Sequence, residues 1–197
     1  MSEMLRTVGP NKAKSAILRA MKKKRPIFLW GPPGIGKSDI VAQVTDTLPN
    51  SHLIDIRLSL WDPTDIKGIP HFNPKTEKMT WGAPEELPDE EFAAQYDNIV
   101  VFFDEMNSAA PAVQAAAYQL ILNRRVGQYK LPDNVIIIAA GNREADKGVT
   151  YRMPAPLSNR FVHLELAVVF EDWFGWAVDN NQHSDVVGYL QFAKQDL

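Results

Sequence analysis

The sequence contains no cysteine and only four histidines, which restricts the chemistry open to it. Without cysteine there are no disulfides, thiolate metal sites or cysteine nucleophiles, a composition that fits a reducing compartment. His52, His71, His163 and His183 have no metal-binding spacing, so ordinary surface or core histidines are the simpler interpretation. Thiol enzymes and most metalloenzymes are therefore excluded.

Long hydrophobic runs and an excess of positive charge are also missing. The longest apolar stretches, 99–103 and 135–140, are far too short to cross a membrane, and the N-terminus has no apolar signal core. We therefore expect a cytoplasmic protein with no membrane partner. The 21 Lys and Arg against 24 Asp and Glu give a net charge of −3, which speaks against nucleic acid unless a local basic patch exists.

What the sequence does contain is a regular alternation of apolar segments typical of an α/β fold. Its 197 residues correspond to about one domain with a small appendage. Strands are predicted at 25–31, 52–60, 97–105, 134–142 and 161–168. Helices are predicted at 11–24, 37–48, 110–123, 170–180 and 183–195. The pattern predicts a five-stranded, mostly parallel sheet in residues 1–168, followed by a short helical segment at 169–197.

One insert interrupts this alternation. Residues 70–91 are rich in proline and turn residues, and two short arms flanking 73–78 predict an exposed β-hairpin over about 70–84. A loop of this length inside a compact domain is usually functional or mobile.

The stretch GPPGIGKS, residues 31–38, fits the phosphate-loop pattern between a predicted strand and a predicted helix. Glycines at such a turn let backbone N–H groups point at phosphate oxygens, at the N-terminus of the following helix. Lys37 would reach the β- and γ-phosphates, and the Ser38 hydroxyl would ligate Mg²⁺. The residues expected to contact the nucleotide here are Gly31, Pro32, Pro33, Gly34, Ile35, Gly36, Lys37 and Ser38.

An apolar strand ending in two acids supplies the expected metal ligand and base. Asp104 is placed to hold Mg²⁺, and Glu105 to orient and deprotonate an attacking water. Such a pair alone is usually a solvated strand end, but together with a phosphate loop it favours a nucleotide-hydrolysing site.

Two further polar residues complete the predicted site. Asn142 ends a buried strand and could hydrogen-bond both the water and the γ-phosphate, although a Gly-Asn pair is also a common turn. Arg160 precedes the last strand, where it could act on a neighbouring subunit's nucleotide, or form a surface ion pair.

The order of these motifs resembles that of AAA+ ATPases, and the details resemble the MoxR-like branch. Segments similar to that branch are 59–84, which contains the hairpin insert, 104–126 and 141–166, and the resemblance covers about residues 10–170. It implies Mg²⁺-dependent ATP hydrolysis, with Glu105, Asn142 and Arg160 in the catalytic roles given above. Arg152 and Arg143 are alternatives for the trans-acting arginine.

The resemblance also implies partners. Members assemble into hexameric rings with ATP between subunits, and often act with a protein client that carries a von Willebrand A domain. Members normally continue into a helical lid bearing a second sensor arginine, whereas this chain ends at Leu197 with no such arginine after Arg160. We therefore expect an incomplete lid at 169–197, which puts ring assembly and turnover in question.

Three functions remain open at this point. The first is a remodelling or chaperone-like ATPase whose hairpin and 61–68 loop face a protein client. The second is a nucleic-acid motor or loader, suggested by the basic helix end at 12–25, although such an end is more often a solvated face. The third is a module that binds nucleotide to order an interface and hydrolyses little. In any of these functions, backbone groups of residues 8–12, ahead of the first predicted helix, are expected to contact the base.

Overall fold

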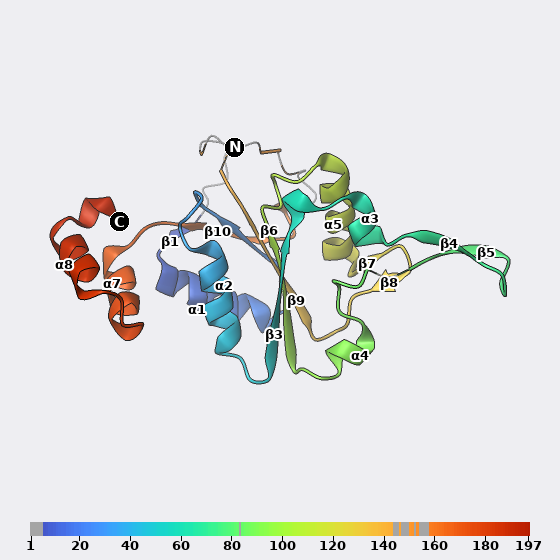
Figure 1. Ribbon diagram of the computed structural model, residues 1–197, viewed down its shortest axis with the longest axis horizontal. Helices are drawn as coiled ribbons and strands as arrows, with labels where there is room; N and C mark the ends of the chain where they lie inside the picture. The colour runs from blue at the N-terminus through green and yellow to red at the C-terminus, as the bar shows by residue number, and fades with distance from the viewer. Residues whose placement is uncertain (1–5, 83, 144–145, 147–149, 152, 154–157) are drawn as a thin grey trace.

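A computed structural model describes residues 6–82, 84–143, 146, 150–151, 153 and 158–197 (Figure 1). Its centre is a six-stranded sheet in which all neighbouring strands are parallel. The strands in spatial order are β1 (Arg6–Val8), β10 (Val162–Leu166), β2 (Ile27–Trp30), β9 (Val135–Gly141), β6 (Asn98–Asp104) and β3 (Ser51–Arg57). The predicted α/β fold with a parallel sheet is confirmed.

The predicted number of strands was one too low. β1 pairs with β10, with Arg6 opposite Leu164 and Val8 opposite Leu166, and so adds an edge strand that the sequence did not suggest. β1 has only three residues, with a single buried side chain, Val8, so no apolar alternation marks it.

Helices cover both faces of the sheet, and the strands supply apolar side chains to each. Along β6, Val100 and Phe102 belong to one core, while Ile99, Val101 and Phe103 belong to the other. This alternation is the two-residue period of a strand buried on both faces. One face is covered by α1 (Pro10–Met21) and α2 (Lys37–Asp46), and the other by α3 (Pro63–Lys67) and α5 (Pro111–Asn123).

Smaller elements connect these layers. A 3₁₀ turn, η1 (Leu58–Leu60), follows β3, and α4 (Glu90–Ala93) precedes β6. Two antiparallel hairpins are formed by β4 (Pro70–Asn73) with β5 (Lys78–Trp81), and by β7 (Arg125–Val126) with β8 (Tyr129–Lys130). The β4–β5 hairpin is the predicted insert, and it projects as an arm from the body of the molecule (Figure 1).

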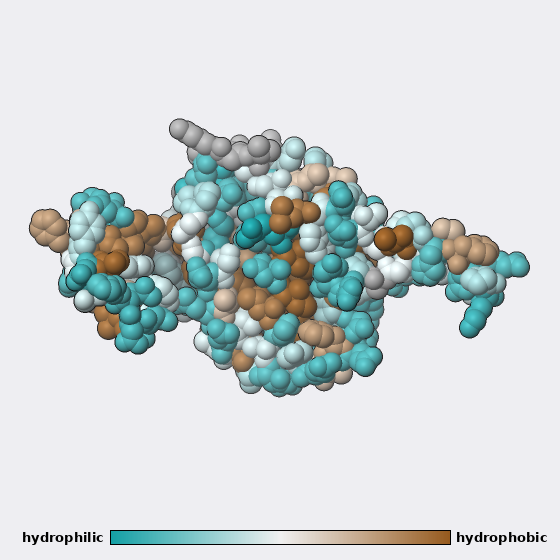
Figure 2. Space-filling view, in the orientation of Figure 1, coloured by the Kyte–Doolittle hydropathy of each residue, from teal (hydrophilic) through white to brown (hydrophobic). Residues whose placement is uncertain are grey.

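The C-terminal segment lies at the opposite end of the molecule from this arm (Figure 1) and consists of α7 (Phe170–Asp179), α8 (Ser184–Phe192) and the turn η3 (Lys194–Asp196). The Asp172 carboxylate joins α7 to the start of α1, because it accepts hydrogen bonds of 2.9 Å from both the backbone and the side-chain amide of Asn11. Figure 2 shows hydrophobic side chains both on this segment and on the β4–β5 arm. Within the described residues, no helix is long and apolar enough to span a membrane.

Because the strands are parallel, the carboxyl ends of β2, β6 and β9 open onto one edge of the sheet, where α/β proteins bind ligands. The polar motifs that follow these three strands are brought together there.

Candidate nucleotide-binding site

The loop between β2 and α2 has a backbone that requires glycine. Gly34 has φ of +80° and Gly36, the residue that caps α2, has φ of +87°. Side-chain-bearing residues rarely adopt these angles. The loop therefore ends at the N-terminus of α2, where free N–H groups and the helix dipole favour an anion.

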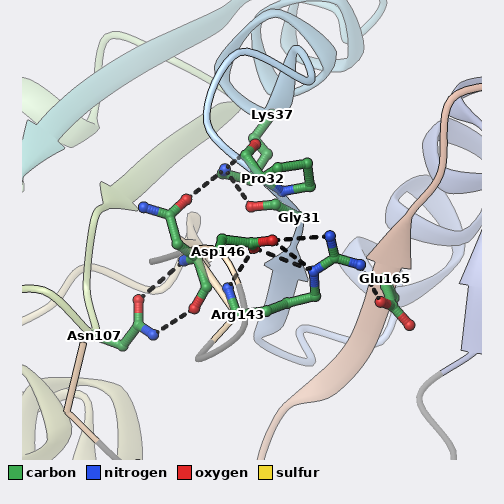
Figure 3. A network of polar contacts seen from close by, with 8 residues as sticks. Gly31, Pro32, Lys37, Asn107, Arg143, Asp146 and Glu165 are labelled. Atoms are coloured by element: carbon green, nitrogen blue, oxygen red, sulfur yellow. Dashed lines mark hydrogen bonds and ion pairs between the residues drawn. The ribbon is translucent and has the colours of Figure 1, made fainter. Parts of the chain in front are cut away.

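Lys37 is held at the centre of the site (Figure 3). Its ammonium donates hydrogen bonds to the carbonyl oxygens of Gly31 (2.8 Å) and Pro32 (3.0 Å), and to Oδ1 of Asn142 (3.0 Å). Only 8% of the residue is exposed, and this burial lowers the pKa of the ammonium, an effect that the nearby Asp104 carboxylate opposes. A fixed, poorly solvated cation at a phosphate loop is suited to binding phosphate.

Ser38 and Asp104 form a pair of oxygen ligands beside it. The Ser38 hydroxyl donates a 3.1 Å hydrogen bond to Oδ2 of Asp104, and Oδ1 of Asp104 accepts one of 2.7 Å from the Glu105 backbone. Mg²⁺ is typically held by one or two protein oxygens, with phosphates and waters completing its octahedron. The donor set fits this ion. Within the described ranges no cluster of three or more His, Cys, Asp and Glu side chains suggests a metal held by protein alone.

Glu105 adopts an uncommon backbone conformation, with φ of +53° although it is not glycine. Strained residues of this kind cluster at functional sites. Its carboxylate accepts a hydrogen bond from the Ser59 hydroxyl and lies 3.8 Å from the Arg57 guanidinium. The side chain is thus held toward the end of β3. Sequence reasoning assigned no role to Ser59 or Arg57.

Asn142 is positioned by a second asparagine that the sequence analysis did not single out (Figure 3). Asn107 donates to the Asn142 carbonyl oxygen (2.7 Å), and its own carbonyl oxygen accepts from the Asn142 backbone N–H (3.1 Å). A Cβ on Gly141 would collide with the Asn107 side chain, so Gly141 allows this close approach. The sequence does offer one signal for this role, because Asn107 is an amide residue only two positions after the Asp104-Glu105 pair.

We expect Asn107→Ala to lower the free energy of unfolding by about 1–3 kcal/mol, because two partly buried backbone groups of Asn142 lose their partners. It should also lower kcat more than it raises KM, because Asn142 loses its support next to Lys37. Gln114→Ala is the matched control: Gln114 is also 3% exposed, lies on α5 and donates a hydrogen bond to the Ala109 carbonyl, with no contact to Asn142. Steady-state kinetics and thermal unfolding of both variants check this, and equal kcat in the two would contradict a positioning role.

The three candidate arginines differ in their surroundings. Arg143 is paired with Asp146 (2.9 Å) and Glu165 (2.8 Å) of its own chain, and the hydrogen bonds that it donates to these carboxylates raise the pKa of its guanidinium (Figure 3). Arg152 lies outside the described residues. Arg160 is exposed, just before β10 begins, and therefore lies at the amino edge of the sheet, away from its own phosphate loop.

Two adjoining cavities lie beside the phosphate loop. The smaller, of about 220 Å³, is lined by the loop together with Lys37, Ser38, Asp104, Glu105 and Asn142. The larger, of about 250 Å³, lies between α1, α2 and α7 and shares Gly34, Gly36 and Asp39 with the first. The arrangement places a polar compartment beside a more apolar one, which is walled partly by Trp173 and Trp176.

Comparisons with known proteins agree with this geometry. Residues 27–166 match the model of the family "ATPase family associated with various cellular activities (AAA)". The chain is 24% identical over 192 residues to Midasin of Giardia intestinalis, covering 92% of this chain and 4% of that protein. A crystal structure of a candidate ATPase from Cytophaga hutchinsonii superimposes with a TM-score of 0.61 at 19% identity, over 90% of this chain and 52% of the other. The chain thus spans about half of one relative and a small part of the other.

Proposed function

The chain belongs to the AAA family of ATPases. On this premise we propose that it binds ATP with Mg²⁺ across the two adjoining cavities beside the phosphate loop, and that it hydrolyses the ATP. The observation that carries the proposal is the convergence of Lys37, Asn142, Ser38 and Asp104 from three separate segments around one small cavity. Lys37 would neutralise the β- and γ-phosphates, and Mg²⁺ held by Ser38 and Asp104 would stabilise charge on the phosphoryl oxygens. Asn142 would orient the water.

The nucleoside would occupy the larger cavity. Pro10 and Ile35 provide apolar contacts there, and Trp173 and Trp176 offer aromatic ones. Pro10 lies within the segment 8–12 that the sequence suggested for base contacts. The site would thus depend on α7, which the Asn11–Asp172 hydrogen bonds hold against α1.

Glu105 would remove a proton from the attacking water. Its carboxylate also lines the smaller cavity, and its contacts with Ser59 and Arg57 would compete with a hydrogen bond to a water near the γ-phosphate. This restraint favours slow turnover until a partner or a neighbouring subunit releases it, as in the nucleotide-gated module considered above.

Ser59→Ala tests that restraint. Removing the hydroxyl should raise the turnover of the unassembled chain several-fold while leaving the affinity for ATP within about twofold, since Ser59 lines neither cavity. Hydrolysis measured with protein in excess over ATP, and again with ATP in excess over protein, checks this. A turnover at or below the wild-type value would show that the Ser59 contact does not hold Glu105 back.

We place the protein in the MoxR-like branch as a remodelling ATPase that acts on a protein client. The β4–β5 arm supports a client-facing role, because it presents Phe72 and Met79 directly opposite each other, 59% and 57% exposed. Isolated two-stranded hairpins with an open apolar face are marginally stable alone, so this face is suited to a partner. A client with a von Willebrand A domain, and assembly as a hexamer, follow only from the resemblance.

Arg160 is the residue we propose to act on a neighbouring subunit's nucleotide. Arg160→Ala should leave ATP affinity within about twofold and lower the turnover of the assembled protein by on the order of 10³, the effect of losing a trans-acting arginine. Mixing it with a Lys37→Ala chain should restore part of the activity, because some interfaces then combine an intact loop with an intact arginine. If the mixture is no more active than its components, Arg160 does not act in trans.

A further inference from the structure

A cavity of about 420 Å³ lies away from the nucleotide site, at the amino edge of the sheet. It lies between the end of α1, the end of α5 and the start of β9, segments that are distant in the sequence. Lys23, Lys24, Arg25 and Arg124 contribute to its rim, and Arg160 borders it as well. Among the described lining residues there is no Asp or Glu, in a chain with more acids than bases.

Two cations of this amino-edge cleft, Arg124 and Lys24, are held by backbone carbonyl groups. Arg124, half-buried at the end of α5, donates a 3.0 Å hydrogen bond to the Val135 carbonyl, and Lys24 donates one of 2.9 Å to the Asp133 carbonyl. No ion pair within 4.0 Å joins any of the rim cations to a carboxylate of the described chain. Burial lowers the pKa of the Arg124 guanidinium, and the Asp133 carboxylate opposes that effect from a distance. A ligand that carries negative charges would complement this basic rim.

The floor of the cleft is aliphatic. Ile121, Ile136 and Ile137 lie at its base with 6%, 8% and 5% of their surface exposed, and the half-buried Leu122 stands beside them. A ligand that pairs with the basic rim and also covers the aliphatic floor must carry negative charges at its edges and an apolar group between them. A nucleic-acid backbone offers nothing apolar to such a floor, and the described lining residues include no aromatic side chain on which a base could stack.

We propose that the amino-edge cleft binds an acidic peptide segment of a partner protein, in which aliphatic side chains alternate with carboxylates. The aliphatic groups would cover the isoleucine floor and the carboxylates would pair with the rim, an arrangement typical of an interface with an apolar centre and a charged border. The chain's own acidic stretch, 85–91, does not supply this in a second folded copy, because Leu87 is only 3% exposed. The proposal extends the client-binding function above to a defined chemistry.

The test uses a fluorescein-labelled synthetic peptide of alternating glutamate and leucine, with binding to the full chain followed by anisotropy. The double variant Lys23→Glu, Arg25→Glu should weaken binding roughly tenfold or more, because two of the exposed rim charges are reversed. Lys22→Glu is the control: it reverses one charge on an exposed neighbour that does not line the cleft, and should change the affinity by less than about twofold. A peptide with serine in place of leucine should bind at least several-fold more weakly to the unaltered chain.

Equal peptide affinity in the double variant and the wild type would overturn the proposal. So would equal affinity for the leucine and serine peptides, a comparison that needs no altered protein. Tighter, competing binding of a single-stranded oligothymidine would assign the cleft to nucleic acid instead, and concentration-dependent self-association lost in the double variant would assign it to a second copy. Peptide binding should persist in Lys37→Ala, so loss of ATP binding and loss of the partner site can be told apart.

Discussion

Lys37→Ala should weaken ATP binding by at least about a hundredfold, which corresponds to roughly 2.7 kcal/mol. Among the described residues that line the smaller cavity, Lys37 is the one cation, and its ammonium is already positioned by three oxygen acceptors. Charge-assisted bonds of a buried cation to phosphate are among the stronger polar interactions in proteins. Isothermal titration with ATP and Mg²⁺ measures the effect.

The control for this substitution is Lys22→Ala, which removes the same side chain from an exposed position just after α1. It should bind ATP with unchanged affinity. Both variants should unfold cooperatively, which shows that the loss at Lys37 is one of binding and not of the fold. ATP affinity in Lys37→Ala close to that of the wild type would contradict the assignment of residues 31–38 as the phosphate site.

Glu105→Gln should lower kcat by about 10²–10³ while ATP affinity stays within about twofold. The amide keeps the size of the side chain and can still contact the Ser59 hydroxyl, but it cannot accept a proton from water, a contribution that general bases supply at this scale. Phosphate release under saturating ATP measures kcat, and a separate titration measures affinity.

Glu85→Gln serves as the control, because Glu85 is an exposed acid that lines neither cavity of the nucleotide site. Its kcat should equal that of the wild type. An unchanged kcat in Glu105→Gln would move the catalytic base to another residue. A loss of ATP affinity in that variant would assign Glu105 to binding.

Most of the fold could be predicted from the sequence because its strands are apolar on both faces and its helices are amphipathic. β6 and β9 consist almost entirely of buried residues. The glycines between β2 and α2 mark where the strand ends and where the helix begins. β1 could not be found in this way, because a three-residue edge strand has no periodicity and exists only through its pairing with β10. Local patterns do not encode such pairing partners.

The site was partly predictable for a similar reason. The 31–38 loop and Asp104 lie at the ends of strands whose carboxyl ends must meet in a parallel sheet, and the structure places Asp104 and most of this loop around one cavity. The contacts of Glu105 with Ser59 and Arg57, and of Asn107 with Asn142, join segments more than 30 residues apart. The amino-edge cleft combines α1, α5 and β9, so the basic end of α1 alone did not reveal it.

The most direct test of the central claim is ATP turnover of the wild type and Glu105→Gln across protein concentration, with molecular mass followed in the same samples. We predict that wild-type turnover per subunit rises as assemblies form, and that Glu105→Gln assembles and binds ATP equally but hydrolyses about 10²–10³ times more slowly. Equal hydrolysis by the two proteins at every concentration would contradict a nucleotide site that uses Glu105 as its base. Tight ATP binding with no hydrolysis in any assembled sample would contradict an ATP-hydrolysing machine.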